Sequence, residues 1–97
     1  MYWLLIYELA DDYMERRPAL RPAHLGLAEE AHARGELVMA GALADPVDRA
    51  VLVFSGDDRS VAEDFARNDP YVREGLVTSW EVRSWTVVVG GAPPARG

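Results

Sequence analysis

The chain lacks the residues that most covalent enzymes use as nucleophiles. Its 97 residues include no cysteine, no lysine and no Gly-x-Ser-x-Gly motif. These absences exclude thiolate and Schiff-base chemistry and the nucleophile elbow of the hydrolases. Without cysteine there are also no disulfides, iron–sulfur clusters or thiolate zinc sites, which fits a reducing cytoplasm. We therefore expect a cytoplasmic protein that works without covalent catalysis.

Positive charge is also in short supply. The net charge is −6, and all ten basic residues are arginines. Nucleic acids and anionic membrane surfaces both require a basic face, so we expect neither as a partner. The apolar N-terminal segment is short and has no basic leader, which predicts neither a signal peptide nor a membrane-spanning helix.

Histidine occurs only twice, as His24 and His32. The two are too far apart to share a metal ion, and the acidic pairs Asp11-Asp12 and Asp57-Asp58 have no histidine at ligand spacing. We expect no metal site and no cofactor, and we expect His32 to be a surface residue. His24 remains as the candidate general acid or base, with Asp69 as the carboxylate that would orient it.

Apolar runs separated by turn residues divide the chain into a β-α-β-β-α-β order. Strands are predicted over 2–9, 37–43, 50–54 and 77–89, and helices over 13–34 and 60–68. Asp69-Pro70 is typical of the start of a further helical turn, which Gly75 would end. The order predicts one α+β, ferredoxin-like domain over residues 1–89, a four-stranded antiparallel sheet with two helices on one face. Residues 90–97 are expected to form a flexible tail.

Two prolines complicate the first helix. Pro18 and Pro22 are disfavoured deep inside one continuous helix, which predicts two helical pieces. With Pro22 in the first turn of the main piece, His24 would lie near a helix N-terminus. There the helix dipole disfavours the imidazolium ion, whereas a nearby carboxylate favours it.

The first strand is apolar on both faces, although two helices can cover only one face of the sheet. An uncovered apolar sheet face marks an association surface. The simplest arrangement is a homodimer in which the open sheet faces of two copies meet. We therefore predict a homodimer with a small-molecule pocket beside or between the sheets.

Several motifs follow one another in a recognisable order. Arg17 and His24 lie in the first helical region, Gly41 lies near the end of the second strand, and Asp69-Pro70-Tyr71 follows the second helix. In this order they resemble the YCII-related (YciI-like) family of the dimeric α/β-barrel superfamily, over nearly the whole chain. The resemblance implies a dimer whose active site is built on a histidine–aspartate pair, here His24 and Asp69.

Each candidate site residue also has a purely structural interpretation. Asp69 is a natural helix N-cap, and one of its oxygens could cap while the other reaches His24. Arg17 would bind an anionic group or pair with a nearby acid. Gly41 would allow a ligand to approach the strand or mark a bulge. Tyr71 would donate a hydrogen bond to a substrate or simply pack.

The leading functional hypothesis is a cofactor-independent enzyme. His24 would act as general base, or as acid and base in turn, in an elimination or isomerisation of a small cyclic or aromatic molecule. Two alternatives stay open. One is a non-catalytic dimer that binds a small ligand or serves as an accessory subunit, and the other is a cofactor-free polyketide monooxygenase.

Overall fold

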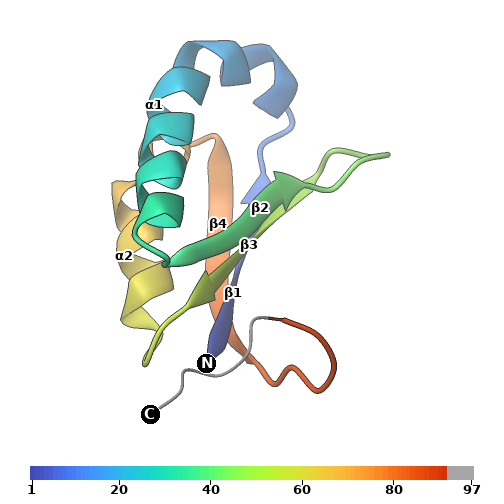
Figure 1. Ribbon diagram of the computed structural model, residues 1–97. Coiled ribbons are helices and arrows are strands. Elements are labelled where there is room, and N and C mark those ends of the chain that lie inside the picture. Colours follow the sequence, from blue (N-terminus) through green and yellow to red (C-terminus); the bar gives the residue numbers. More distant parts are fainter. Residues whose placement is uncertain (92–97) are drawn as a thin grey trace.

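The computed structural model describes residues 1–91 and forms one sheet with helices on one side. The elements are β1 (Tyr2–Leu9), α1 (Tyr13–Ala33), β2 (Leu37–Ala42), β3 (Arg49–Ser55), α2 (Ser60–Asn68), α3 (Pro70–Arg73) and β4 (Val77–Trp85). The four strands are antiparallel in the order β2-β3-β1-β4 (Figure 1). The predicted α+β, ferredoxin-like fold is confirmed.

The predicted break in the first helix is wrong, because α1 is one helix that contains both Pro18 and Pro22. A proline removes the N–H that would donate to the carbonyl four residues earlier, here the carbonyls of Met14 and Pro18. These residues are exposed, so water can reach the freed carbonyls. Figure 1 shows α1 bent in its N-terminal part, as prolines inside a helix cause. His24 consequently lies in the middle of α1.

The two faces of the sheet differ in their cover. On the side of the helices, Leu5 and Tyr7 of β1 are buried, and Phe54 of β3 packs against Phe65 of α2. We call the opposite side the open face. The strand registers place apolar side chains there, namely Tyr2, Leu4, Ile6, Met39, Val51, Val53 and Trp85. Trp85 and Met39 are 46% and 65% exposed, whereas Val53 is buried, so no helix covers this side of the sheet and part of its apolar surface is open.

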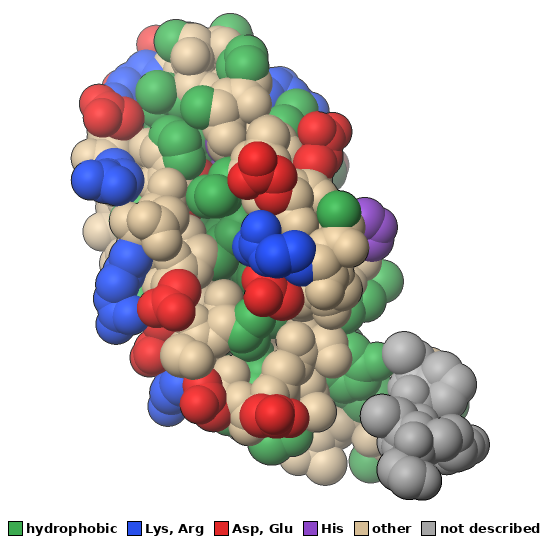
Figure 2. Space-filling model, turned by 60° about the vertical axis from the view of Figure 1, so that its left-hand side comes forward, with side chains coloured by type: hydrophobic (Ala, Val, Ile, Leu, Met, Phe, Trp, Pro, Cys, Tyr) green, Lys and Arg blue, Asp and Glu red, His purple; other side chains and the backbone are tan. Residues whose placement is uncertain are grey.

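The final strand is shorter than predicted. β4 ends at Trp85 rather than at residue 89, and Val88 and Val89 after it are exposed. Of the predicted tail, residues 92–97 lie outside the described part of the chain. No helix within residues 1–91 is long and apolar enough to cross a membrane. Figure 2 shows that acidic and arginine side chains are interspersed on the visible face.

Candidate active site

The centre of the site is Asp69, whose side chain is fully buried. As the N-cap of α3, it accepts a hydrogen bond from the backbone N–H of Tyr71 to Oδ1 at 3.0 Å. The same Oδ1 lies 2.8 Å from Nδ1 of His24, and Oδ2 accepts from the Tyr7 hydroxyl at 2.7 Å. Oδ1 therefore serves both the cap and His24, whereas the sequence suggested one oxygen for each.

The imidazole of His24 is fixed on several sides. Its Nδ1 faces a carboxylate oxygen, which accepts, so Nδ1 carries the hydrogen. The ring stacks on Tyr71 with centroids 3.8 Å apart and planes at 4°, and Phe65 meets it edge-on at 6.4 Å. Within residues 1–91, Nε2 has no hydrogen-bond partner. Because His24 lies in mid-helix, the helix-dipole effect expected from the sequence does not apply.

Tyr7 is a member of the site that the sequence did not reveal. It stands on β1, 62 residues before Asp69, and its ring is 1% exposed. Burial, together with the charge of Asp69 and the hydrogen bond to it, raises the pKa of Tyr7 well above its usual range. The phenol is therefore a permanent donor that holds the carboxylate in place.

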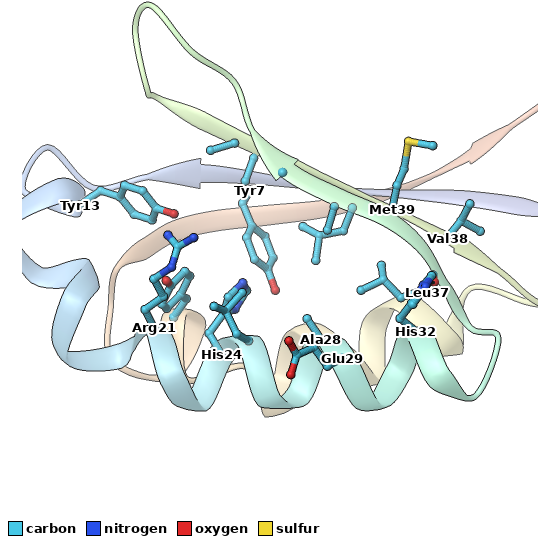
Figure 3. Close-up of a pocket in the computed structure, with 17 residues that line it drawn as sticks. Tyr7, Tyr13, Arg21, His24, Ala28, Glu29, His32, Leu37, Val38 and Met39 are labelled. Atoms are coloured by element: carbon cyan, nitrogen blue, oxygen red, sulfur yellow. The ribbon is translucent and has the colours of Figure 1, made fainter.

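A pocket opens between α1 and the sheet, next to this cluster (Figure 3). It encloses about 430 Å³. Tyr13 and Arg21 lie toward one end, and His32 toward the other. Most of the remaining lining is aliphatic and comes from α1, β2 and β3, for example Leu25, Ala28, Leu37, Ala40 and Leu52. The pocket therefore combines apolar walls with polar groups at its two ends and with the carboxylate of Glu29, which lies between His24 and His32.

Two arginines lie at the Tyr13 end. Arg17 does not line the pocket. Its guanidinium carbon lies 5.8 Å from the ring centroid of Tyr13, which does. Its Nε is buried and has no hydrogen-bond partner in the described residues. Arg21, one turn further along α1, does line the pocket. Burial, with a smaller contribution from Tyr13, raises the pKa of Tyr71 to about 12, against the opposing effect of both arginines.

Gly41 and Tyr71 both line the pocket. A Cβ added to Gly41 would meet no atom within 4 Å, so no close packing requires glycine there. The register irregularity of β2 lies between Leu37 and Met39, not at Gly41. Tyr71 forms a wall by stacking on His24.

The structure adds Arg21 and His32 to the residues singled out from the sequence. Arg21 precedes His24 by three residues and His32 follows it by eight, so helical spacing placed all three on similar sides of α1. His32 is exposed, as expected, yet it also lines the pocket. Tyr7 gave no local signal, because it ends a run of apolar residues, Tyr2 to Tyr7, in which nothing sets it apart.

No cluster of three or more potential metal ligands occurs among residues 1–91. Taken together, the fold and the site define a class: small ferredoxin-like domains in which a pocket beside the first helix holds a histidine bonded to a buried aspartate. The chain belongs to the YCII-related domain family, whose model matches residues 1–86.

One similar solved structure is 5-chloro-2-hydroxyhydroquinone dehydrochlorinase from Burkholderia phenoliruptrix, in complex with 2,5-dihydroxybenzoquinone. The two chains are 19% identical and superpose with a TM-score of 0.74, over 89% of this chain and 94% of the other. A search of curated proteins found no significant match. At this level of identity, the structural likeness bears on the fold alone.

Proposed function

We propose that this protein is a cofactor-independent enzyme that catalyses elimination or isomerisation of a small cyclic or aromatic molecule. His24 is the general base and Asp69 orients it. The observation that carries the proposal is the 2.8 Å contact between His24 Nδ1 and a fully buried carboxylate, at the wall of a pocket. A buried carboxylate at this nitrogen leaves Nε2 as the nitrogen that meets a substrate.

The chemistry needs only a proton acceptor and a leaving group. In the loss of HCl from the keto tautomer of a chlorinated hydroquinone, in which chlorine sits on a tetrahedral carbon, Nε2 takes the proton of a ring hydroxyl. The O–H bonding pair forms a carbonyl, the ring double bond shifts to the chlorine-bearing carbon, and chloride leaves with the carbon–chlorine pair. The imidazolium formed is stabilised by Asp69, whose position Tyr7 and the Tyr71 backbone hold. A base of this kind supplies a factor of about 10²–10⁴ in rate.

The pocket supports a small ring as the substrate class. Its aliphatic walls suit an apolar ring, and Arg21 suits a phenolate or other anionic oxygen. The dehydrochlorinase of the same fold is named for a chlorinated, hydroxylated benzene, which makes such compounds the first to test. Substrate contacts by Gly41, by Tyr71 and by Arg17 stay predictions, and Arg17 would act beside Arg21 at the pocket end.

We also propose that two copies associate through the open face. Its apolar side chains lie beside charged groups. Glu8 pairs across the strands with Arg49, and on the edge strand β4 Glu81 and Arg83, 3.7 Å apart, stand opposite Ile6 and Leu4. Paired charges beside an apolar patch suit a self-complementary interface. The molar mass in solution tests this proposal. We expect the wild type to be a dimer and Leu4→Glu to be a monomer. A monomeric wild type would contradict this part of the proposal. The cytoplasmic location stays a prediction.

The catalytic proposal is tested by chloride release from 5-chloro-2-hydroxyhydroquinone under nitrogen. We expect release by the wild type above the rate in buffer, and a loss of about 10²–10⁴-fold in His24→Gln. Glu30→Gln, an exposed residue of α1 that does not line the pocket, is the matched control and should keep the rate. Equal rates for wild type and His24→Gln would contradict the proposal. Tight binding of the compound without any turnover would instead favour a non-catalytic binding protein.

A further inference from the structure

The pocket contains a second imidazole that the proposed chemistry does not use. His32 lines the pocket from the last turns of α1, and its Nδ1 lies 2.8 Å from the carbonyl oxygen of Leu37. A carbonyl oxygen only accepts, so Nδ1 carries the hydrogen. In the neutral ring, Nε2 then holds a lone pair, and it has no hydrogen-bond partner within residues 1–91. The hydrogen bond to the main chain thus fixes the ring of His32, and Nε2 remains able to accept a hydrogen bond from a ligand.

The two histidines stand on one side of α1 with a small residue between them. His24, Ala28 and His32 follow one another at four-residue intervals, and all three line the pocket (Figure 3). Eight residues of helix separate the two histidine Cα atoms by about 12 Å. Taking this Cα separation as that of the two Nε2 atoms, a hydrogen bond of about 2.8 Å at each end leaves about 6 Å between the ligand atoms. That span matches one six-membered ring with oxygens at opposite positions.

We infer that His32 is a specificity-determining residue, which accepts a hydrogen bond from a ring hydroxyl lying opposite the substituent that faces His24. The ligand class is a single planar ring with hydroxyl groups at two opposite positions. This inference rests on the proposed function for the identity of the reacting end of the pocket. Leu25, Ala28 and Leu37 present hydrocarbon to the ring between the histidines, and Glu29 adds a carboxylate to the same stretch of the lining.

The test compares two probes that differ by one hydroxyl group, hydroquinone and phenol. Wild type should bind hydroquinone about 3- to 10-fold more tightly than phenol, the range of one neutral hydrogen bond. His32→Asn keeps an amide donor near the position of Nδ1 for Leu37 but offers nothing at Nε2. In this variant we expect the affinity ratio to fall to about one.

His32→Gln is the complementary variant. It places an amide near the position of Nε2 but loses the donor at Nδ1, so it should keep part of the preference for hydroquinone. If His32→Gln loses the preference while His32→Asn keeps it, His32 serves only the turn into β2 and the inference is overturned. An unchanged ratio in His32→Asn, or no binding of either probe to wild type, also overturns it.

The outcome is separable from that of the catalytic proposal. Probe affinities involve no turnover, whereas chloride release depends on His24. Should wild type release no chloride while His32→Asn abolishes the preference for hydroquinone, the catalytic proposal is wrong and the role of His32 stands. Should His24→Gln stop chloride release while His32→Asn leaves the affinity ratio intact, the catalytic proposal stands and the proposed role of His32 is wrong.

Discussion

The two histidines of α1 are anchored by different kinds of partner. His24 is bonded to a side chain 45 residues away that is fully buried and shared with Tyr7. His32 is bonded to a main-chain carbonyl only five residues away, that of Leu37 at the start of β2. A long-range partner makes the orientation of His24 depend on the whole fold, whereas the anchor of His32 is local. Variants of the two anchors should therefore differ sharply in their cost.

Removing the long-range anchor should have the largest effect. Asp69→Ala deletes the acceptor of three hydrogen bonds in a fully buried position. Buried donors without acceptors are costly, so we expect the free energy of unfolding to fall by about 3 kcal/mol or more. Chemical denaturation at pH 7 measures this change. A loss below about 1 kcal/mol would contradict the central place of Asp69.

Removing one donor to that anchor should cost less. Tyr7→Phe keeps the buried ring but deprives Oδ2 of Asp69 of its partner. A hydrogen bond to a charged group contributes about 1.5–3 kcal/mol, so we expect a loss of about 2 kcal/mol in the free energy of unfolding. Tyr13→Phe, a buried tyrosine whose hydroxyl makes no hydrogen bond to residues 1–91, is the matched control. If the two variants cost the same, the Tyr7 hydroxyl has no special role.

Alkaline pH should reversibly lower the free energy of unfolding, because of the tyrosines at the same anchor. The pKa values of Tyr7 and Tyr71 are raised in the folded protein, that of Tyr71 to about 12, whereas unfolded tyrosine titrates near 10. Above pH 10 the unfolded chain gives up protons that the folded chain keeps, so stability falls as the pH rises. Tyr7 alone contributes about 1.4 kcal/mol per pH unit. Denaturation at pH 9, 10 and 11 should show a shallower fall for Tyr7→Phe, and an equal fall in both proteins would refute the assignment.

The local anchor should matter least for stability. His32→Ala removes one partly exposed hydrogen bond to Leu37, and the carbonyl set free can bond to water. We expect a loss of no more than about 1 kcal/mol in the free energy of unfolding. A loss as large as that of Asp69→Ala would erase the difference between the two histidines.

The same contrast explains how much of the site could be read from the sequence. Asp69-Pro70 as a helix start and Gly75 at its end follow local rules, and the structure bears out both. Tyr7 could not be found, because its partner is 62 residues away and the five residues before it are all apolar. The continuity of α1 through Pro18 and Pro22 was missed because exposure of the freed carbonyls depends on tertiary structure.

The order of elements, by contrast, followed from the alternation of apolar runs and turns. Four strands and two long helices leave few antiparallel arrangements, and the resemblance in the Asp69-Pro70-Tyr71 block narrowed them further. The predicted start of the first helix is wrong, so the predicted position of His24 near a helix N-terminus is wrong too. The argument from the helix dipole therefore does not apply, whereas the contact between His24 and Asp69 is present.

The account is tested most directly by the tautomer of His24 in the resting protein. With only two histidines in the chain, the ¹⁵N spectrum of histidine-labelled protein contains two imidazoles, and His32→Asn assigns them. The account predicts that neutral His24 carries its proton on Nδ1 and that Nε2 is bare and shifts when a ring hydroxyl compound binds. A proton on Nε2 in the neutral ring would contradict it.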